Sequence, residues 1–423
     1  MAASKVKVKN TRMNLVYTSI YSLIGGFGLD ALAPMFAEEP LRLNTLLKVA
    51  GVLGIGYYAW NWSKFDGLFR HLGLGVDGAY PIQKSVNKHD TSTIYKFTLP
   101  SGLCLKDFED KKDRIEQHLG REVDIKYTYK EIWIEVFKPN QKTRYDYVPT
   151  DIKGDVPIII GYDRKGNLIS CDLSVGEPHM GVYGETGSGK STVMRSIITN
   201  LILKSNVILH LIDLKNGAEF GIFRKSKKVA NFCRNVKETE DLLTEISIEV
   251  DRRYDLFFEK DVKDIKEYNK KFKNKKMNYQ MVIIDEFADL NPKSKSMGIL
   301  KELGRKSRAC GIHLLLATQR PSATILDGDI KANITSILGL KTVNGTNSSV
   351  AIDETGLEKL RGMGHGKFKR GGNIIELQCP FLDVDPCKEL IKDTYIDKKV
   401  VNKEVKNGNV SEKTILEAID SLC

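Results

Sequence analysis

The sequence predicts an α/β protein with a mostly parallel sheet, preceded by a small α+β module and by an N-terminal transmembrane hairpin of two helices. Three observations support this fold class. Strands and helices alternate beyond Lys153, as they do in proteins with a parallel sheet. Short strand-like segments bounded by turn residues occupy about 92–137. Two long apolar stretches lie near the N-terminus, at about 15–36 and 45–62.

Charge and cysteine content bound the kind of protein. The 423 residues carry a formal net charge of +11, with 28% charged and 41% hydrophobic residues, which is ordinary for a globular chain of two or three domains. A basic balance fits a polyanion such as nucleic acid or an anionic membrane face, although a Lys-rich composition can also be a bias of the source genome. The seven cysteines form no CxxC pair, so we predict neither a zinc site nor a disulfide framework.

Residues 1–66 are expected to form the transmembrane hairpin. Each of its helices, about 15–36 and 45–62, approaches the roughly 20 residues that span a bilayer. Lys and Arg residues precede the first stretch and follow the second, which predicts a multi-pass protein of the cell membrane with the rest of the chain in the cytoplasm. Asp30 and Lys48 are costly inside a bilayer, so a buried helical hairpin in a soluble protein is the alternative.

Residues 67–150 are expected to be a linker followed by the small α+β module. The expected elements are a strand at 93–99, an amphipathic helix at 105–119, and two strands at 123–129 and 131–137. The module contains no catalytic constellation, so its expected role is that of a spacer or an oligomerisation module.

A glycine-rich loop between a strand and a helix predicts a nucleotide site in residues 151–386. The strand is Met180–Tyr183, and the helix is expected from about Lys190 to Leu203. The loop and first helical turn consist of Gly184, Glu185, Thr186, Gly187, Ser188, Gly189, Lys190, Ser191 and Thr192. This spacing is typical of a P-loop NTPase with a RecA-like motor, whose backbone N–H groups and helix N-terminus bind the phosphates of ATP. Lys190 is expected to reach the β- and γ-phosphates, and Ser191 to ligate Mg²⁺.

Three further buried strands are expected in the motor, at 207–213, 281–286 and 312–318. An apolar strand that ends in Asp-Glu is the Walker B pattern. Asp285 is expected to hold magnesium through water, and Glu286 to orient and deprotonate the attacking water. Gln319 follows the last of these strands and is a candidate γ-phosphate sensor; an ordinary polar strand end is the alternative.

Basic segments surround these strands. The segment Lys301–Arg308 is a basic helical patch, and either Arg305 or Arg308 could serve a neighbouring subunit as an arginine finger, with a solvated or DNA-facing charge as the alternative. The segment Glu259–Lys276 holds eight lysines and four acids. We expect it to be a solvated helix and loop, with a DNA-facing insertion as the alternative. Residues 387–423 are expected to be a polar tail with a short terminal helix.

Several segments of the motor resemble the FtsK/SpoIIIE family of DNA-translocating ATPases. Beyond the P-loop they are Glu177–Met180, Asp213–Lys215, Asp251–Tyr254, Asp285–Leu290, Arg308–Leu314, Ala317–Ser322, Ile330–Ile334 and Gly362–Gly364. The resemblance covers roughly 155–385. It implies a homo-hexameric ring around double-stranded DNA, ATP and Mg²⁺ between subunits, and Arg308 acting in trans. DNA binding is then expected to be mostly independent of sequence.

Departures from the family pattern narrow the expected role. Ile337 stands where the family usually has an arginine, and a C-terminal winged-helix DNA-reading domain is not expected. The chain looks more like the coupling ATPases of conjugative plasmids and integrative elements of Gram-positive bacteria, which imply a relaxase and transfer-channel proteins as partners. The alternatives are a chromosome translocase of division or sporulation, and a nucleotide-binding scaffold that recruits a relaxosome with little turnover. A protein-secretion ATPase is a further alternative, but those usually carry tandem motors.

Overall fold

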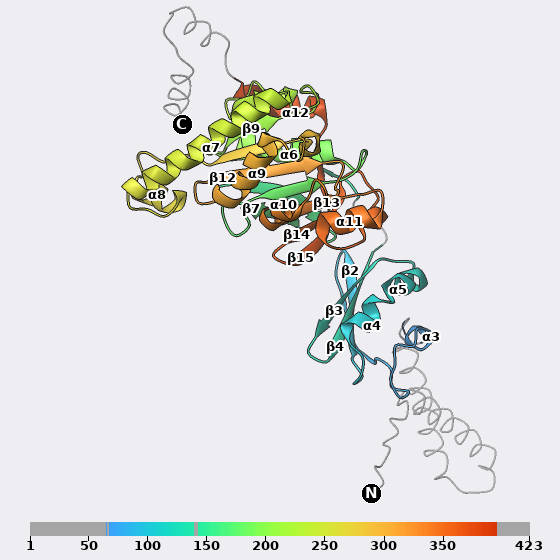
Figure 1. The fold of residues 1–423 in the computed structure, drawn as a ribbon. Coiled ribbons are helices and arrows are strands. Elements are labelled where there is room, and N and C mark those ends of the chain that lie inside the picture. The colour runs from blue at the N-terminus through green and yellow to red at the C-terminus, as the bar shows by residue number, and fades with distance from the viewer. Residues whose placement is uncertain (1–64, 66, 139–142, 396–423) are drawn as a thin grey trace, which may run out of the picture. The chain divides into compact units, whose positions relative to one another are not determined.

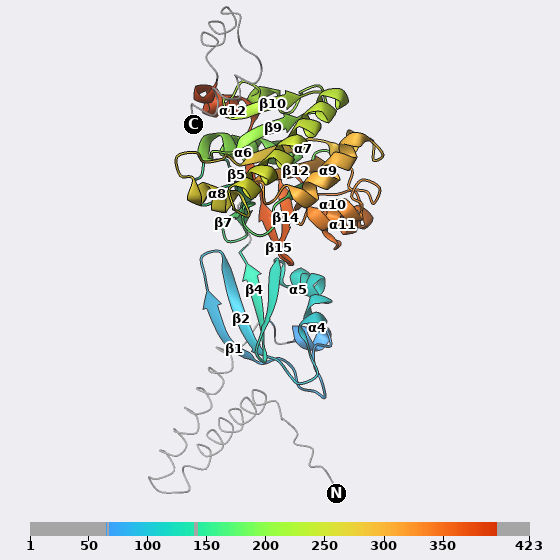
Figure 2. The same cartoon turned by 60° about the vertical axis from the view of Figure 1, so that its left-hand side comes forward.

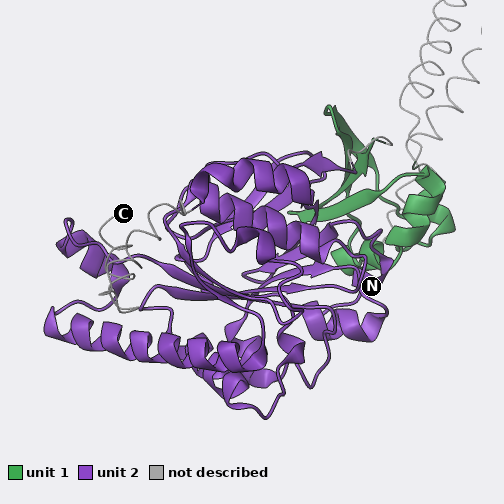
Figure 3. Ribbon diagram, turned by 90° about the horizontal axis from the view of Figure 1, so that it is seen from above, with its two compact units in different colours: residues 1–141 green, residues 142–423 purple. Residues whose placement is uncertain are grey.

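The computed structural model describes residues 65, 67–138 and 143–395 (Figure 1). They belong to two compact units, coloured green and purple in Figure 3: unit 1 extends to Gln141, and unit 2 begins at Lys142. The expected hairpin helices at about 15–36 and 45–62, and the expected terminal helix of the tail, lie outside the described residues. The domain boundaries at 66, 150 and 386 remain predictions.

No helix in the described part of the chain is long and apolar enough to cross a membrane. Helix α6 (Lys190–Lys204) is largely buried but has 15 residues, fewer than the roughly 20 that a span needs. Helix α7 (Val236–Glu259) has 24 residues but is amphipathic, with charged side chains along its length. On this finding the predicted localisation, a multi-pass protein of the cell membrane, is wrong.

Unit 1 is a four-stranded antiparallel sheet with short helices on one face (Figure 2). Its elements are α3 (Leu68–His71), β1 (Gln83–Lys88), β2 (Ser92–Thr98), α4 (Leu105–Glu109), α5 (Lys112–Leu119), β3 (Val123–Thr128) and β4 (Glu131–Phe137). Alternate residues such as Phe97 and Ile134 form its core with Phe108 and Ile115 of the helices. The helix expected at 105–119 is two helices, and the expected linker contains β1.

Unit 2 is built on a ten-stranded sheet. Its strands are β5 (Tyr145–Asp146), β6 (Pro157–Asp163), β7 (Leu168–Asp172), β8 (Met180–Tyr183), β9 (Ile208–Ile212), β10 (Val229–Cys233), β11 (Gln280–Ile284), β12 (Ile312–Thr318), β13 (Ser336–Leu340), β14 (His365–Arg370), β15 (Asn373–Gln378) and β16 (Pro380–Phe381). Strands β5 and β16 pair separately. Besides α6 and α7, its helices are α8 (Ile265–Lys271), α9 (Lys295–Lys306), α10 (Gly328–Asn333), α11 (Gly345–Ile352) and α12 (Val384–Ile391). Short 3₁₀ turns are η2 (Gly221–Phe223), η3 (Phe287–Asp289), η4 (Leu357–Lys359) and η5 (Lys392–Thr394).

The large sheet is mixed, whereas the sequence predicted a mostly parallel one. Its order is β10-β9-β11-β12-β8-β13-β14-β15-β6-β7. The strands from β10 to β13 are parallel, and those from β14 to β7 are antiparallel. The difference follows from the connections. Strands β14 and β15 are joined by Gly371 and Gly372, both with positive φ, and so short a turn permits only antiparallel pairing.

Helices cover both faces of this sheet, which Figure 3 shows nearly edge-on. Helix α6 packs against α12, while α7 and α10 both contact α9. Strand β8 lies in the middle, between β12 and β13. Because β8, β9, β11 and β12 are parallel, their carboxyl ends meet at one edge, where open α/β sheets bind ligands.

Candidate ATP site

The P-loop, residues 184–191, joins the carboxyl end of β8 to the N-terminus of α6. Gly189 has φ +101°, in the region that only glycine adopts readily. A Cβ on Gly189 would lie 2.4 Å from the backbone nitrogen of Gly364, which itself donates a 2.7 Å hydrogen bond to the carbonyl of Ser188. The Gly362–Gly364 segment therefore packs directly on the P-loop, and this close approach requires glycine at 189.

Two features of the loop fit the phosphates of ATP. The Ser188 hydroxyl is buried without a hydrogen-bond partner in the described part of the chain. The first N–H groups of α6 have no intrahelical acceptor, as at any helix N-terminus, and they point out from the turn that carries Ser191 and Thr192. The residues present therefore fit the predicted anion.

The Walker B carboxylate is buried between two lysines. Lys190 Nζ lies 2.5 Å from Asp285 Oδ1 and donates a further 2.8 Å bond to the Asp285 carbonyl. Lys215 Nζ lies 3.2 Å from the other oxygen, Oδ2. The side chains of Lys190 and Asp285 are 3% and 1% exposed, so this pair is screened little by water. The structure thus brings the P-loop and the Walker B strand together.

Lys215 is held charged by this arrangement. Partial burial disfavours its ammonium form, but the negative charges of Asp285, Glu286 and Glu219, Asp285 foremost, together outweigh that effect and hold the pKa of Lys215 above its ordinary value. The loop that carries Lys215 is fixed by buried Asp213, whose oxygens accept hydrogen bonds from the backbone N–H groups of Lys215, Glu219 and Phe220. Asp213 therefore anchors a loop, which is a structural role.

The structure brings Glu286 and Gln319 together beside the P-loop. The Thr318 hydroxyl donates to Glu286 Oε1 at 2.5 Å, and the backbone N–H of Gln319 donates to Oε2 at 2.9 Å. The Gln319 side-chain oxygen accepts a 2.8 Å hydrogen bond from the hydroxyl of Thr186. Gln319 thus connects the P-loop to the carboxylate that we predict to be the general base.

Arg308 does not join these residues. It is exposed and precedes the amino end of β12, whereas the P-loop lies at the carboxyl ends of the strands. The seven residues of β12 separate the two by roughly 20 Å at the rise of an extended strand. Arg253 and Tyr254 of α7 fix this region, because Arg253 donates to the Cys310 carbonyl at 2.7 Å and the Tyr254 hydroxyl to the Lys306 carbonyl at 2.7 Å.

Sequence reasoning missed Thr318 as a site residue and did not assign a role to Lys215. Thr318 ends a strand whose other residues are apolar except for His313, and it immediately precedes Gln319, a signal that could have placed it at the same sheet edge. Lys215 stood in a recognised segment, but its contact with Asp285 joins residues 70 positions apart. No local pattern reveals such a pairing.

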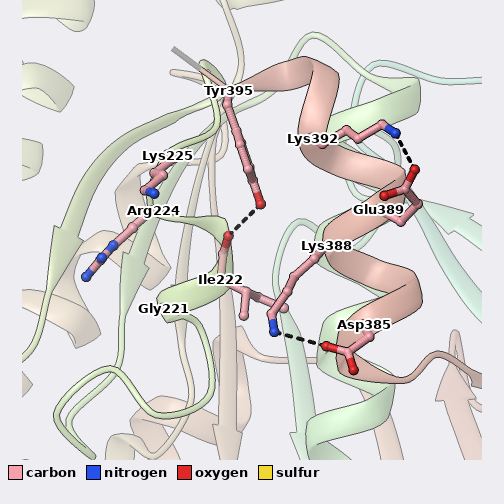
Figure 4. Close-up of a pocket in the computed structure, with 9 residues that line it drawn as sticks. All are labelled: Gly221, Ile222, Arg224, Lys225, Asp385, Lys388, Glu389, Lys392 and Tyr395. Carbon is pink, nitrogen blue, oxygen red and sulfur yellow. Dashed lines mark hydrogen bonds and ion pairs between the residues drawn. The ribbon is translucent and has the colours of Figure 1, made fainter. Parts of the chain in front are cut away.

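A cavity of about 450 Å³ lies elsewhere in unit 2, between the turn before β10 and helix α12 (Figure 4). The lining residues are Gly221, Ile222, Arg224, Lys225, Asp385, Lys388, Glu389, Lys392 and Tyr395. Within it Lys388 pairs with Asp385, and Lys392 with Glu389. No residue of the P-loop or of the Walker B strand lines this cavity, so the cavity is separate from the candidate ATP site at the sheet edge.

This fold and this site define a P-loop ATPase. Residues 149–323 match the FtsK/SpoIIIE family, so the resemblance inferred from the sequence is confirmed over this stretch. The DNA translocase FtsK of Caldanaerobacter subterraneus subsp. tengcongensis is 34% identical over 284 residues, which cover 62% of this chain and 39% of that protein. The FtsK of Borreliella burgdorferi is 33% identical over 283 residues, covering 62% and 36%. The chain thus spans less than two fifths of the length of either relative.

Solved structures show a similar fold. The pCW3 conjugation coupling protein TcpA, solved as a monomer with ATPγS, is 26% identical with a TM-score of 0.55, and the match covers 78% of this chain and 97% of that one. The cytoplasmic domain of the type VII secretion ATPase EccC of Thermomonospora curvata is 21% identical with a TM-score of 0.52, covering 62% and 33%. The second likeness concerns the fold alone.

Proposed function

We propose that this chain is an ATP-driven DNA translocase that serves as a coupling protein, delivering DNA to a conjugative transfer channel. One observation carries the choice of this role. The similarity to the conjugation coupling protein TcpA covers 78% of this chain, which is more than unit 2 alone contains, and nearly all of TcpA. The FtsK proteins of three bacteria match 62% to 79% of this chain but well under half of each relative, so the share of the relative that is matched separates the two similarities.

The site supports hydrolysis of ATP. In our proposal the P-loop and Lys190 bind the phosphates, while Ser191 and Asp285 hold Mg²⁺, which supplies charge neutralisation at the transferring phosphoryl group. Glu286 removes the proton from the attacking water, and Gln319 senses the γ-phosphate through its neighbour Thr186. Glu286 is 4% exposed, so bulk water is largely excluded from this base.

We infer that the chain works as a ring, a homo-hexamer in keeping with the family resemblance, with ATP between subunits. Arg308 lies at the sheet edge opposite its own P-loop, which supports a role at the nucleotide of a neighbouring subunit. The net charge of +11 supports a nucleic acid partner that is held mainly through its phosphates. Relaxase and channel proteins are the further partners that this role requires.

The test is a mating experiment with donor cells that lack this chain. Complementation with the wild-type chain should restore DNA transfer, whereas Lys190→Ala should leave transfer at background, because the phosphates lose their lysine. Growth and chromosome partition should be normal in all donors. Normal transfer together with trapped or missing chromosomes would favour a chromosome translocase. Transfer restored by Lys190→Ala would favour the scaffold with little turnover.

A further inference from the structure

The Asp285 carboxylate contacts two lysines, which follow two different strands in the chain. Lys190 follows β8 and contacts Oδ1, while Lys215 follows β9 and contacts Oδ2. The carboxylate is 1% exposed, so water contributes little to its solvation. A carboxylate in such surroundings needs a counter-charge, because an unpaired buried charge is strongly destabilising.

Lys190 has two tasks that exclude each other. In the structure it gives two hydrogen bonds to Asp285, one to the carboxylate and one to the main-chain carbonyl. A P-loop lysine must instead reach the β- and γ-phosphates when ATP binds. Moving Lys190 away would strip Asp285 of its nearest cation, unless a second cation remained in place.

The contacts of Lys215 keep it beside Asp285. Its backbone is held by Asp213, and its Nζ contacts the oxygen of Asp285 that Lys190 does not use. The Lys215–Asp285 ion pair at 3.2 Å therefore does not depend on Lys190. Because the single negative charge of Asp285 contacts two lysines, it attracts Lys190 less strongly than it would without Lys215.

We infer that Lys215 is a positioning residue that releases Lys190 from Asp285, so that Lys190 can turn to the phosphates of ATP. This inference rests on the proposed role of Lys190 but not on any role in DNA transfer. Without Lys215, Lys190 becomes the sole counter-ion of a buried carboxylate, and ATP must break that pair in order to bind.

The test measures binding of a fluorescent ATP analogue to the full chain in EDTA, so that magnesium cannot contribute. Lys215→Met should weaken binding by at least about tenfold, the scale of breaking a buried charge pair. Lys215→Arg should restore most of the affinity, since it keeps the cation. Lys225→Met, which removes an exposed lysine ten residues along the same connection, should bind like wild type. Thermal unfolding of each variant checks folding, and Lys215→Gln replaces Lys215→Met if the latter does not fold.

A double-mutant cycle separates this mechanism from direct contact with ATP. In an Asp285→Asn background no charge pair holds Lys190, so Lys215→Met should change binding by less than about twofold. If Lys215→Met weakens binding equally in both backgrounds, Lys215 acts on the nucleotide itself and the inference is wrong. Unchanged binding of Lys215→Met in the Asp285 background would overturn it as well.

Discussion

Glu286 owes its orientation to two donors at the end of the neighbouring strand. The Thr318 hydroxyl bonds one carboxylate oxygen at 2.5 Å, and the Gln319 backbone bonds the other at 2.9 Å. Thr318 Oγ1 in turn accepts a 3.0 Å bond from the backbone N–H of Arg320. Because the carboxylate is 4% exposed, these bonds fix its direction where water cannot.

Glu286→Gln should separate ATP binding from ATP hydrolysis. The amide keeps the size and most of the hydrogen bonds but cannot take a proton, so turnover should fall at least ~10²-fold, the scale of a lost general base. Affinity for ATP should change little, since the P-loop is intact. Steady-state phosphate release and nucleotide binding measure the two effects. Wild-type turnover in Glu286→Gln would contradict the assignment.

Three buried histidines are kept neutral by unit 2. Burial lowers the pKa of His179 to about 3, and that of His210 and His313 to about 4. His179 explains the Pro178-His179 segment that leads into β8: its ring bonds the Gly304 carbonyl of α9 at 3.1 Å and accepts from the Leu314 N–H of β12 at 3.0 Å. It thereby ties the strand before the P-loop to its neighbours.

These histidines predict that stability falls in mild acid. In the unfolded chain they protonate near pH 6.5, whereas in the folded chain they stay neutral to about pH 4. The unfolded state therefore binds more protons as the pH falls below 6.5, and the free energy of unfolding should drop by up to about 1.4 kcal/mol per pH unit for each histidine. Urea unfolding at pH 7.5 and 5.5 tests this. Equal stability at the two values would show that the rings are accessible to protons.

At the scale of elements, helix α9 leads into the segment that carries Arg308 at the edge of the sheet. Ser294 caps its N-terminus by accepting from the Met297 N–H, and Arg305 and Lys306 in its last turn suit the negative end of the helix dipole. The helix nevertheless contains two glycines. Gly304 faces Asn333 of α10, where a Cβ would come within 3.2 Å of the Asn333 Cβ, but Gly298 is exposed with nothing near it.

These two glycines give a matched pair of substitutions. Gly298→Ala should raise the free energy of unfolding by about 0.5–1 kcal/mol, because alanine loses less backbone entropy in a helix and the added methyl meets open space. Gly304→Ala should gain less, since α9 and α10 must move apart to admit the methyl. Urea denaturation of both variants measures the difference. An equal gain from the two would mean that packing at Gly304 is looser than the structure indicates.

How much the sequence could predict depended on how local the signal was. The strands Met180–Tyr183 and Ile312–Thr318 have the predicted bounds, and α6 ends within a residue of the predicted helix, because apolar runs and a glycine loop mark their ends. The antiparallel half of the sheet could not be predicted. Its pairing of β15 with β6 joins residues about 200 positions apart, and neither strand carries a motif. The contacts of Lys215 and Thr318 depend on that kind of long-range assembly.

At the scale of the whole molecule, the position of Arg308 has consequences for activity. Arg308 lies at the edge opposite the P-loop of its own chain, and Arg253 and Tyr254 of α7 bond the carbonyls of Cys310 and Lys306 on either side of it. If it completes a neighbour's site, Arg308→Ala should cost on the order of 10³-fold in turnover, the scale of an arginine finger. Binding of ATP should change much less, because the P-loop holds the ground state.

Mixing subunits tests the action in trans. Arg308→Ala and Lys190→Ala chains are each expected to be inactive alone. In mixed rings some interfaces pair an intact P-loop with an intact arginine, so partial hydrolysis should return. If mixed rings form but remain inactive, Arg308 acts within its own chain or the ring needs every site; titration with wild-type subunits separates these outcomes. Full activity of Arg308→Ala alone would point to Arg305 or Arg320.

We propose that ATP hydrolysis moves this protein along DNA, and displacement of a third strand from duplex DNA tests this proposal most directly. The full chain with ATP and Mg²⁺ should release a triplex-forming oligonucleotide from the end of a linear duplex, at rates that depend little on the duplex sequence. Lys190→Ala and Glu286→Gln should release none above background while the latter still binds ATP. Wild-type protein that hydrolyses ATP and binds the duplex but leaves the third strand in place would contradict the claim.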